Sequence, residues 1–226
     1  MVVANPLMHP CLLQGLRCLV FDCDGVLIDS LEANLRYYGM LRSGLGLPAL
    51  TRAEAEYVHT RTHREAVLHI VPEPLRDRAW AMVRAFDSAS LLPYLRRSDG
   101  VRQFLWWLRD AGFRLAVNTS RTDSMDQILG RMDLEGFFQP VVTSGQVSSP
   151  KPHPEGLHRI MDAHGVAPCE VAYIGDSAVD MAAAEAAGVR FWAYRDRRLR
   201  AEVHIESFWE IKAAMQRCYN RGAVPF

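Results

Sequence analysis

The sequence is poor in lysine, in net charge and in long apolar runs, and each shortage narrows the class of protein. Only two of its 26 basic residues are lysines, Lys151 and Lys212, and 26 acidic residues bring the formal net charge to zero. Because a non-specific nucleic-acid binder usually carries a basic excess, we expect no nucleic-acid partner. No run of about 18 uncharged apolar residues occurs, so we expect no membrane span.

Cysteine is also scarce and irregularly spaced. The count is odd and no CxxC pair occurs among the five, which are Cys11, Cys18, Cys23, Cys169 and Cys218. We therefore expect neither a disulfide framework nor a structural zinc site, and a reducing compartment fits better. The N-terminal segment lacks a basic n-region and contains Pro6 and Pro10, which indicates a short arm and not a signal peptide. We predict a cytoplasmic protein.

The remaining composition is that of a globular protein of one or two domains, with 226 residues, 49% of them hydrophobic and 23% charged. The apolar run 16–21 ends in acids and predicts a buried strand. Residues 30–92 follow helical periods, with capping-box patterns that begin at Thr51 and Thr62. After Pro93, predicted strands alternate with helices. This pattern predicts an α/β fold with a doubly wound parallel sheet, interrupted by an all-helical insertion.

Polar residues follow four of the predicted strands. Asp22 and Asp24 follow the first and residues 118–120 the second, while Lys151 and Asp176 follow the third and fourth. In such sheets, ligands bind beyond the carboxyl ends of the strands. Paired carboxylates suit Mg²⁺, which usually shares them with phosphate oxygens, and the hydroxyls and the lysine are donors to those oxygens. This combination predicts phosphoryl transfer.

Four segments resemble, in order and spacing, the motifs of the haloacid dehalogenase-like hydrolase superfamily: FDCDGVLIDS (21–30), RLAVNTS (114–120), SSPKPHPEG (148–156) and VAYIGDSAVDMAAAEAAG (171–188). The first matches the pattern DxDG[TV]hxD. The resemblance implies a Rossmann-like hydrolase core over residues 1–30 and 94–226 and a helical cap over residues 31–93. The cap looks like that of the phosphoglycolate phosphatase and β-phosphoglucomutase branch.

The resemblance also assigns the chemistry. Asp22 would be the nucleophile that forms an aspartyl phosphate, and Asp24 would protonate the leaving oxygen and then activate water. Asp22 and Asp176, helped by the backbone carbonyl of Asp24, would hold Mg²⁺. Gly25 would permit the turn that brings the carboxyl groups together. Asp180, one helical turn beyond Asp176, would support the metal ligands.

The phosphate would be held by further motif residues. The resemblance implies that Thr119 and the amide of Ser120 bind the phosphate oxygens. It also implies that Lys151 neutralises the charge between the phosphate and Asp22. The alternatives are that Thr119 and Ser120 only cap a helix, and that Asp180 is a plain surface acid. Cys23, between the two catalytic acids, should point away from them and act as filler.

The cap should choose the substrate. Its basic cluster HTRTHR (59–64), with Arg61 and Arg64, either binds a substrate anion or is a solvated turn. We therefore predict a Mg²⁺-dependent phosphatase of a small phosphorylated metabolite. A β-phosphoglucomutase-like phosphosugar mutase is the alternative enzyme, because Gly25-Val26 also occurs there, and a non-catalytic binding module is the third possibility. The cap has no lysine, which argues against phosphonate cleavage, and Asp24 argues against dehalogenation.

Overall fold

The chain divides into two compact units. The computed structural model describes residues 13–59, 62–122 and 124–219, and no helix within them is long and apolar enough to cross a membrane. One unit, the core unit, comprises Met1–Ile28 and Arg97–Phe226; the other, the helical unit, comprises Asp29–Arg96. The helical unit begins two residues earlier and ends three residues later than the insertion that the sequence predicts.

The core unit is built on one sheet of six strands. They are β1 (Cys18–Phe21), β4 (Arg114–Thr119), β5 (Val141–Thr143), β6 (Val171–Gly175), β7 (Arg190–Tyr194) and β8 (Val203–Ile205). Their order in the sheet is β5-β4-β1-β6-β7-β8, and every neighbouring pair is parallel. The chain therefore winds outward on one side of β1 and then returns to wind outward from β6. The predicted doubly wound parallel sheet is confirmed.

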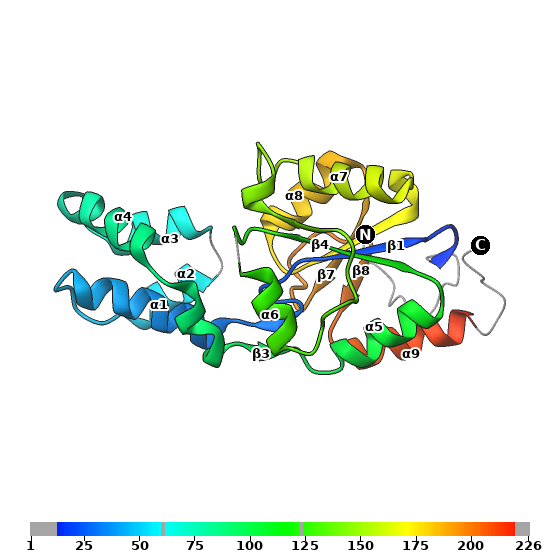
Figure 1. Cartoon of the computed structure of the whole chain (residues 1–226), viewed down its shortest axis with the longest axis horizontal. Coiled ribbons are helices and arrows are strands. Elements are labelled where there is room, and N and C mark those ends of the chain that lie inside the picture. The colour runs from blue at the N-terminus through cyan, green and yellow to red at the C-terminus, as the bar shows by residue number, and fades with distance from the viewer. Residues whose placement is uncertain (1–12, 60–61, 123, 220–226) are drawn as a thin grey trace. The chain divides into compact units, whose positions relative to one another are not determined.

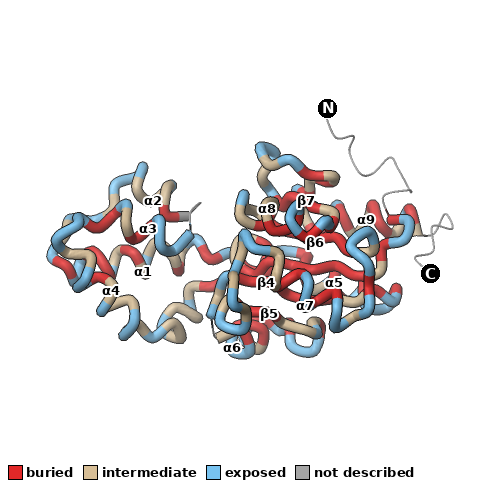
Figure 2. The backbone as a smooth tube through the Cα atoms, turned by 90° about the horizontal axis from the view of Figure 1, so that it is seen from above, coloured by how far each residue is buried: buried red, intermediate tan, exposed pale blue. Residues whose placement is uncertain are grey.

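Helices cover both faces of this sheet (Figure 1). The helices are α5 (Val101–Asp110), α6 (Met125–Arg131), α7 (Glu155–His164), α8 (Ala178–Ala187) and α9 (Phe208–Tyr219). Figure 1 shows α7 and α8 on one side and α5 and α9 on the other. All four residues of β1 are fully buried (Figure 2), which explains why this strand is an unbroken apolar run. Alternate side chains face opposite layers, so Phe21 packs edge-on against Phe104 of α5 while Val20 joins the cluster under α7 and α8.

The helical unit has an apolar core of its own. Its elements are α1 (Leu31–Gly44), α2 (Arg52–His59), α3 (His63–Ile70), η3 (Glu73–Leu75), α4 (Arg76–Ala85) and η4 (Ser88–Tyr94). Tyr38, Leu41, Val67 and Ile70 belong to the buried cluster that holds α1 to α3. The predicted capping box at Thr62 is confirmed. The Thr62 hydroxyl accepts a hydrogen bond from the backbone N–H of Glu65, and the Glu65 carboxylate accepts one from the backbone N–H of Thr62.

Two short strands, β2 (Ile28–Asp29) and β3 (Arg96–Arg97), pair with each other where the chain leaves and re-enters the core unit. The sequence after Pro93 predicts a helix capped by Ser98, and this prediction is wrong. Ser98 is buried and its backbone N–H donates to the carbonyl of Leu27, so the residue belongs to the connection. Helix α5 begins only after Gly100, whose φ of 74° supplies the turn into the helix.

Candidate active site

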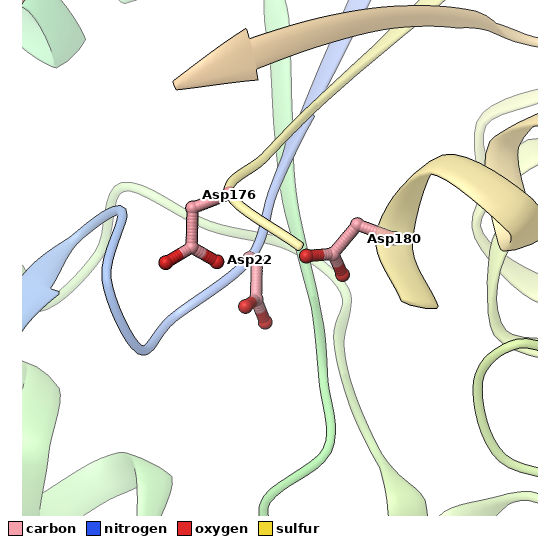
Figure 3. Close-up of side chains that lie close together, drawn as sticks. All are labelled: Asp22, Asp176 and Asp180. Carbon is pink, nitrogen blue, oxygen red and sulfur yellow. The ribbon is translucent and has the colours of Figure 1, made fainter. Parts of the chain in front are cut away.

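The site lies at the carboxyl ends of the two central strands. Asp22 directly follows β1 and Asp176 directly follows β6, and the winding direction of the sheet reverses between these two strands. This is the crevice in which doubly wound sheets bind their ligands. The backbone N–H of Asp22 donates to the carbonyl of Ile174 at 2.9 Å, so the two strand ends are held together. Carboxylate oxygens of Asp22, Asp176 and Asp180 lie within 4.8 Å of one another (Figure 3).

Gly25 makes room for this cluster. Its φ is 73°, in the left-handed region, and the chain turns back so that the Gly25 N–H donates to the carbonyl of Ile28 at 2.8 Å. A Cβ atom at this position would lie 1.8 Å from Oδ2 of Asp176. Glycine is therefore required twice here, once by the backbone conformation and once by the close approach of a carboxylate.

Lys151 is buried among the acids. It lies in the loop between β5 and α7, and its Nζ donates to Oδ1 of Asp22 at 2.8 Å, to Oδ1 of Asp180 at 2.7 Å and to the hydroxyl of Tyr173 at 3.0 Å. Burial by itself would lower the pKa of Lys151, but the carboxylates of Asp180 and Asp22 raise it above its ordinary value. The ammonium group therefore stays charged and holds two carboxylates at once.

Asp180 is a positioning residue for Lys151. The alternative that it is a surface acid is wrong, because it has no exposed surface. Oδ1 accepts from Lys151 and from the Tyr173 hydroxyl at 2.6 Å, and Oδ2 accepts from the hydroxyl of Ser177, which also caps α8. Sequence analysis missed Tyr173, although a tyrosine inside a buried strand must find a partner for its hydroxyl.

Asp24 is held by a residue that sequence analysis also missed. Arg121 donates from Nε to Oδ2 of Asp24 at 2.7 Å and from Nη2 to Oδ1 at 2.8 Å, which is the two-bond geometry that favours an arginine–carboxylate pair. Burial would lower the pKa of Arg121, but the Asp24 carboxylate raises it above its usual value. The only signal in the sequence is that Arg121 follows the predicted phosphate-binding pair Thr119-Ser120.

The other predicted residues of the core unit lie at the same edge of the sheet. Thr119 ends β4, the neighbour of β1, and its side-chain oxygen accepts the backbone N–H of Arg121 at 3.2 Å. Ser120 is exposed and its carbonyl accepts the hydroxyl of Ser144. Cys23 is fully buried, and burial raises the pKa of its thiol well above the ordinary value, which agrees with its predicted role as filler.

Of the two arginines of the helical unit that are predicted to bind substrate, the structure describes one. Arg64 is exposed in the first turn of α3, whereas Arg61 lies outside the described residues. His63, from the same basic cluster, is exposed, and its Nε2 hydrogen-bonds to the hydroxyl of Tyr37 at 2.8 Å; partial desolvation by the surrounding side chains lowers its pKa. His63 therefore belongs to the packing of the helical unit.

The acidic cluster carries an excess of negative charge. Four carboxylates face two cations within the described site: Asp22, Asp24, Asp176 and Asp180 against Lys151 and Arg121. Burial raises the pKa of Asp22 to about 7, and the nearby charge of Asp180 adds to this while Lys151 opposes it. Burial and the charge of Asp22 likewise raise the pKa of Asp176 well above its ordinary value. With all four carboxylates ionised, the site has two more negative than positive charges, which one divalent cation would balance, so the donor set fits a hard metal ion.

A comparison with known families decides the class of this protein. The haloacid dehalogenase-like hydrolase family matches residues 19–194. The chain belongs to this family. It is 30% identical to a phosphoglycolate phosphatase of Xanthomonas campestris pv. campestris in an alignment 196 residues long that covers 79% of this hydrolase and 85% of the relative. It is 28% identical to the pyrophosphatase PpaX of Bacillus velezensis over 78% of this chain and 82% of that one.

A solved structure supports the same assignment. A haloacid dehalogenase-superfamily hydrolase of subfamily IA, variant 1, from Geobacter sulfurreducens matches this hydrolase with a TM-score of 0.76 and 36% identity. The match covers 89% of this chain and 97% of that one. The family and the enzyme class predicted from the four motifs, a hydrolase of the phosphatase type, are confirmed.

Proposed function

We propose that this hydrolase is a Mg²⁺-dependent phosphatase that removes phosphate from a small phosphorylated metabolite of the cytoplasm through an aspartyl phosphate on Asp22. The observation that carries the proposal is the carboxylate of Asp22, nearly buried at the central crevice and fixed by Lys151 at 2.8 Å. A carboxylate held in one orientation beside a permanent cation is suited to attack phosphorus, because its position is set before the substrate arrives.

In the first step, an oxygen of Asp22 forms a bond to phosphorus while the bond from phosphorus to the leaving oxygen breaks. The leaving oxygen takes a proton from Asp24, which must enter this step protonated and with one oxygen released from Arg121. Lys151 stabilises the negative charge near Asp22, and Tyr173 and Asp180 keep the lysine in place. The products of this step are the free alcohol or acid and an aspartyl phosphate.

In the second step, Asp24 takes a proton from water as the water oxygen attacks the phosphorus. The bond to Asp22 breaks, which restores its carboxylate and leaves inorganic phosphate. The hydroxyl of Thr119 and the amide of Ser120 would hold phosphate oxygens in both steps, and their position at the end of the neighbouring strand β4 supports this role. One acid therefore serves as proton donor and then as proton acceptor.

The residues that would hold Mg²⁺ are Asp22, Asp176 and the backbone carbonyl of Asp24. Both oxygens of Asp180 already accept hydrogen bonds, so Asp180 acts on Lys151. When bound, Mg²⁺ supplies positive charge that stabilises the phosphoryl oxygens as negative charge develops on them. The excess of carboxylates over cations in the cluster of Asp22, Asp176 and Asp180 supports this choice of cofactor.

The proposal is tested by phosphate release. Phosphoglycolate and pyrophosphate, named in two relatives, head a panel that also contains sugar phosphates and nucleotides. We expect release from at least one of them, stopped by a chelator and restored by Mg²⁺. We also expect a mass increase on the peptide that contains Asp22 after rapid quenching. Sugar-phosphate isomerisation without release would support the mutase, and neither activity would support a non-catalytic binding module.

A further inference from the structure

Arg121 holds more donors than Asp24 uses. A guanidinium carries five N–H groups, and the two bonds to Asp24 occupy two of them. Among the described residues, Asp24 is the side chain that accepts from this guanidinium. The side chain of Arg121 is 22% exposed, against 4% for Lys151, whose donors are directed at Asp22, Asp180 and Tyr173. Arg121 is thus the cation of the described site that solvent reaches.

The position of Asp24 locates these donors relative to a substrate. A general acid must lie within about 2.6–3.2 Å of the leaving oxygen. The guanidinium nitrogens lie 2.7 and 2.8 Å from the two oxygens of Asp24. The sum of these two distances puts a guanidinium nitrogen of Arg121 within about 6 Å of the leaving oxygen. An anionic group one to three bonds beyond that oxygen can therefore come within hydrogen-bond range of Arg121.

We propose that Arg121 is a specificity-determining residue that binds a second anionic group on the leaving part of the substrate. The proposal rests on the function proposed above. The substrate class is then a phosphate ester or anhydride whose leaving group has its own carboxylate or phosphate close to the scissile oxygen. Arg121 suits this role better than a lysine, because its planar fork binds one carboxylate while it offers further donors to a second anion.

The competing explanation is that Arg121 only orients Asp24. In that case, loss of Arg121 lowers the rate for every substrate alike, because the same acid serves them all. Binding of a second anion instead affects only those substrates that carry one. Substrates that differ in this single group therefore separate the two explanations.

The test compares 2-phosphoglycolate with 2-hydroxyethyl phosphate, and ethylene glycol bisphosphate with the same uncharged ester, in the full-length protein with Mg²⁺. We expect the native enzyme to prefer the charged member of at least one pair. Arg121→Met should lower kcat/KM for that charged substrate by roughly 10- to 100-fold, mostly through KM, as expected for loss of a charged hydrogen-bonding partner. It should lower kcat/KM far less for the uncharged partner. Arg121→Lys should recover part of the loss.

The matched control is Arg17→Met. Arg17 pairs with Glu170 where β1 and β6 begin, at the end of the sheet opposite to the site. Their side chains are 34% and 25% exposed, close to the 22% of Arg121 and the 35% of Asp24. We expect no change in the preference for the charged substrate. An equal loss for both members of each pair, or no preference in the native enzyme, would overturn the proposal. If the native enzyme hydrolyses nothing in the panel, the proposed function itself fails. If Arg121→Met does not fold, the preference of the native enzyme and the effect of Arg121→Lys decide.

Discussion

The ammonium nitrogen of Lys151 lies 2.7 Å from Oδ1 of Asp180, a carboxylate with no exposed surface, although 29 residues separate the two along the chain. The same nitrogen lies 2.8 Å from Asp22. Asp180 therefore connects the capped N-terminus of α8 to the nucleophile through one lysine. The connection has a cost, because buried charges are stable only while their partners are present.

We expect Asp180→Ala to lower the free energy of unfolding by about 3–5 kcal/mol, since it leaves the ammonium of Lys151 partly unpaired in a buried place. We also expect kcat to fall, because Lys151 is no longer fixed beside Asp22. Urea denaturation and phosphate release measure the two effects. The control is Glu185→Ala on the same helix, which breaks an exposed ion pair with Arg200 and should cost at most about 1 kcal/mol. Equal losses in the two variants would show that the buried pair has no special role.

The two acids of the first motif should fail in different ways. Asp22→Asn should abolish turnover and weaken Mg²⁺ binding, because an amide is a poor nucleophile and a poorer metal ligand. Asp24→Asn should lower kcat by about 10²- to 10⁴-fold while it retains Mg²⁺, because its backbone carbonyl is unchanged. Steady-state kinetics and calorimetric Mg²⁺ titration check both variants. A near-normal kcat for Asp22→Asn would exclude the covalent mechanism.

Gly25→Ala should disturb the metal site. A methyl group at this position meets the carboxylate of Asp176, and the positive φ costs a further 1–2 kcal/mol, roughly, in an L-residue. We expect weaker Mg²⁺ binding together with lower activity. Gly136→Ala is the matched control, because Gly136 has a φ of 71° with no atom within 4 Å of a Cβ. If both variants bind Mg²⁺ as the native protein does, the contact with Asp176 is unimportant.

The stability of the helical unit should depend on pH through Glu54. Hydrogen bonds from the backbone and hydroxyl of Thr51, together with the guanidinium of Arg42, lower the pKa of Glu54 from 4.5 to about 2. Because the pKa of the folded state lies below that of the unfolded state, the ionised carboxylate stabilises the fold above about pH 4.3 and loses this effect as the pH falls toward 2. The Tm difference between the native protein and Glu54→Gln should therefore shrink below that pH.

The control for this prediction is Glu56→Gln. Glu56 is on the same helix, α2, and its ion pair with Arg52 is exposed, with 70% and 94% of the two side chains accessible. Such a pair contributes little to stability, so we expect a small Tm change at every pH. A Tm difference for Glu54→Gln that stays constant from pH 7 to pH 3 would contradict the assignment.

The basic cluster of the helical unit predicts a change in substrate preference. Arg61→Ala and Arg64→Ala should lower kcat/KM for the best metabolite more than for p-nitrophenyl phosphate, because binding energy from a remote group is lost only with the substrate that has one. Arg84→Ala, at an exposed position on α4, is the control. If the generic ester loses as much activity as the metabolite, the cluster is a solvated turn.

Much of the fold follows from local patterns in the sequence. The bounds of α8 are an example, because the cap at Ser177, the alanine run and the closing Gly188 are all local signals. The start of α5 is different, since the backbone at Ser98 still pairs with Leu27 and the chain turns into the helix only at Gly100. A helix start predicted from neighbouring residues fails where a tertiary backbone contact extends the connection before it.

By itself, the sequence determined that Asp22, Asp24, Thr119, Lys151 and Asp176 lie at one edge of a sheet. This follows because each comes after a predicted parallel strand, and parallel strands end together. Only the tertiary structure decided which side chains pair. Arg121 binds Asp24 across 97 residues, and Lys151 is shared between Asp22 and Asp180. No periodicity encodes such pairs, because they depend on side-chain directions in three-dimensional space and on the need of each buried charge for a partner.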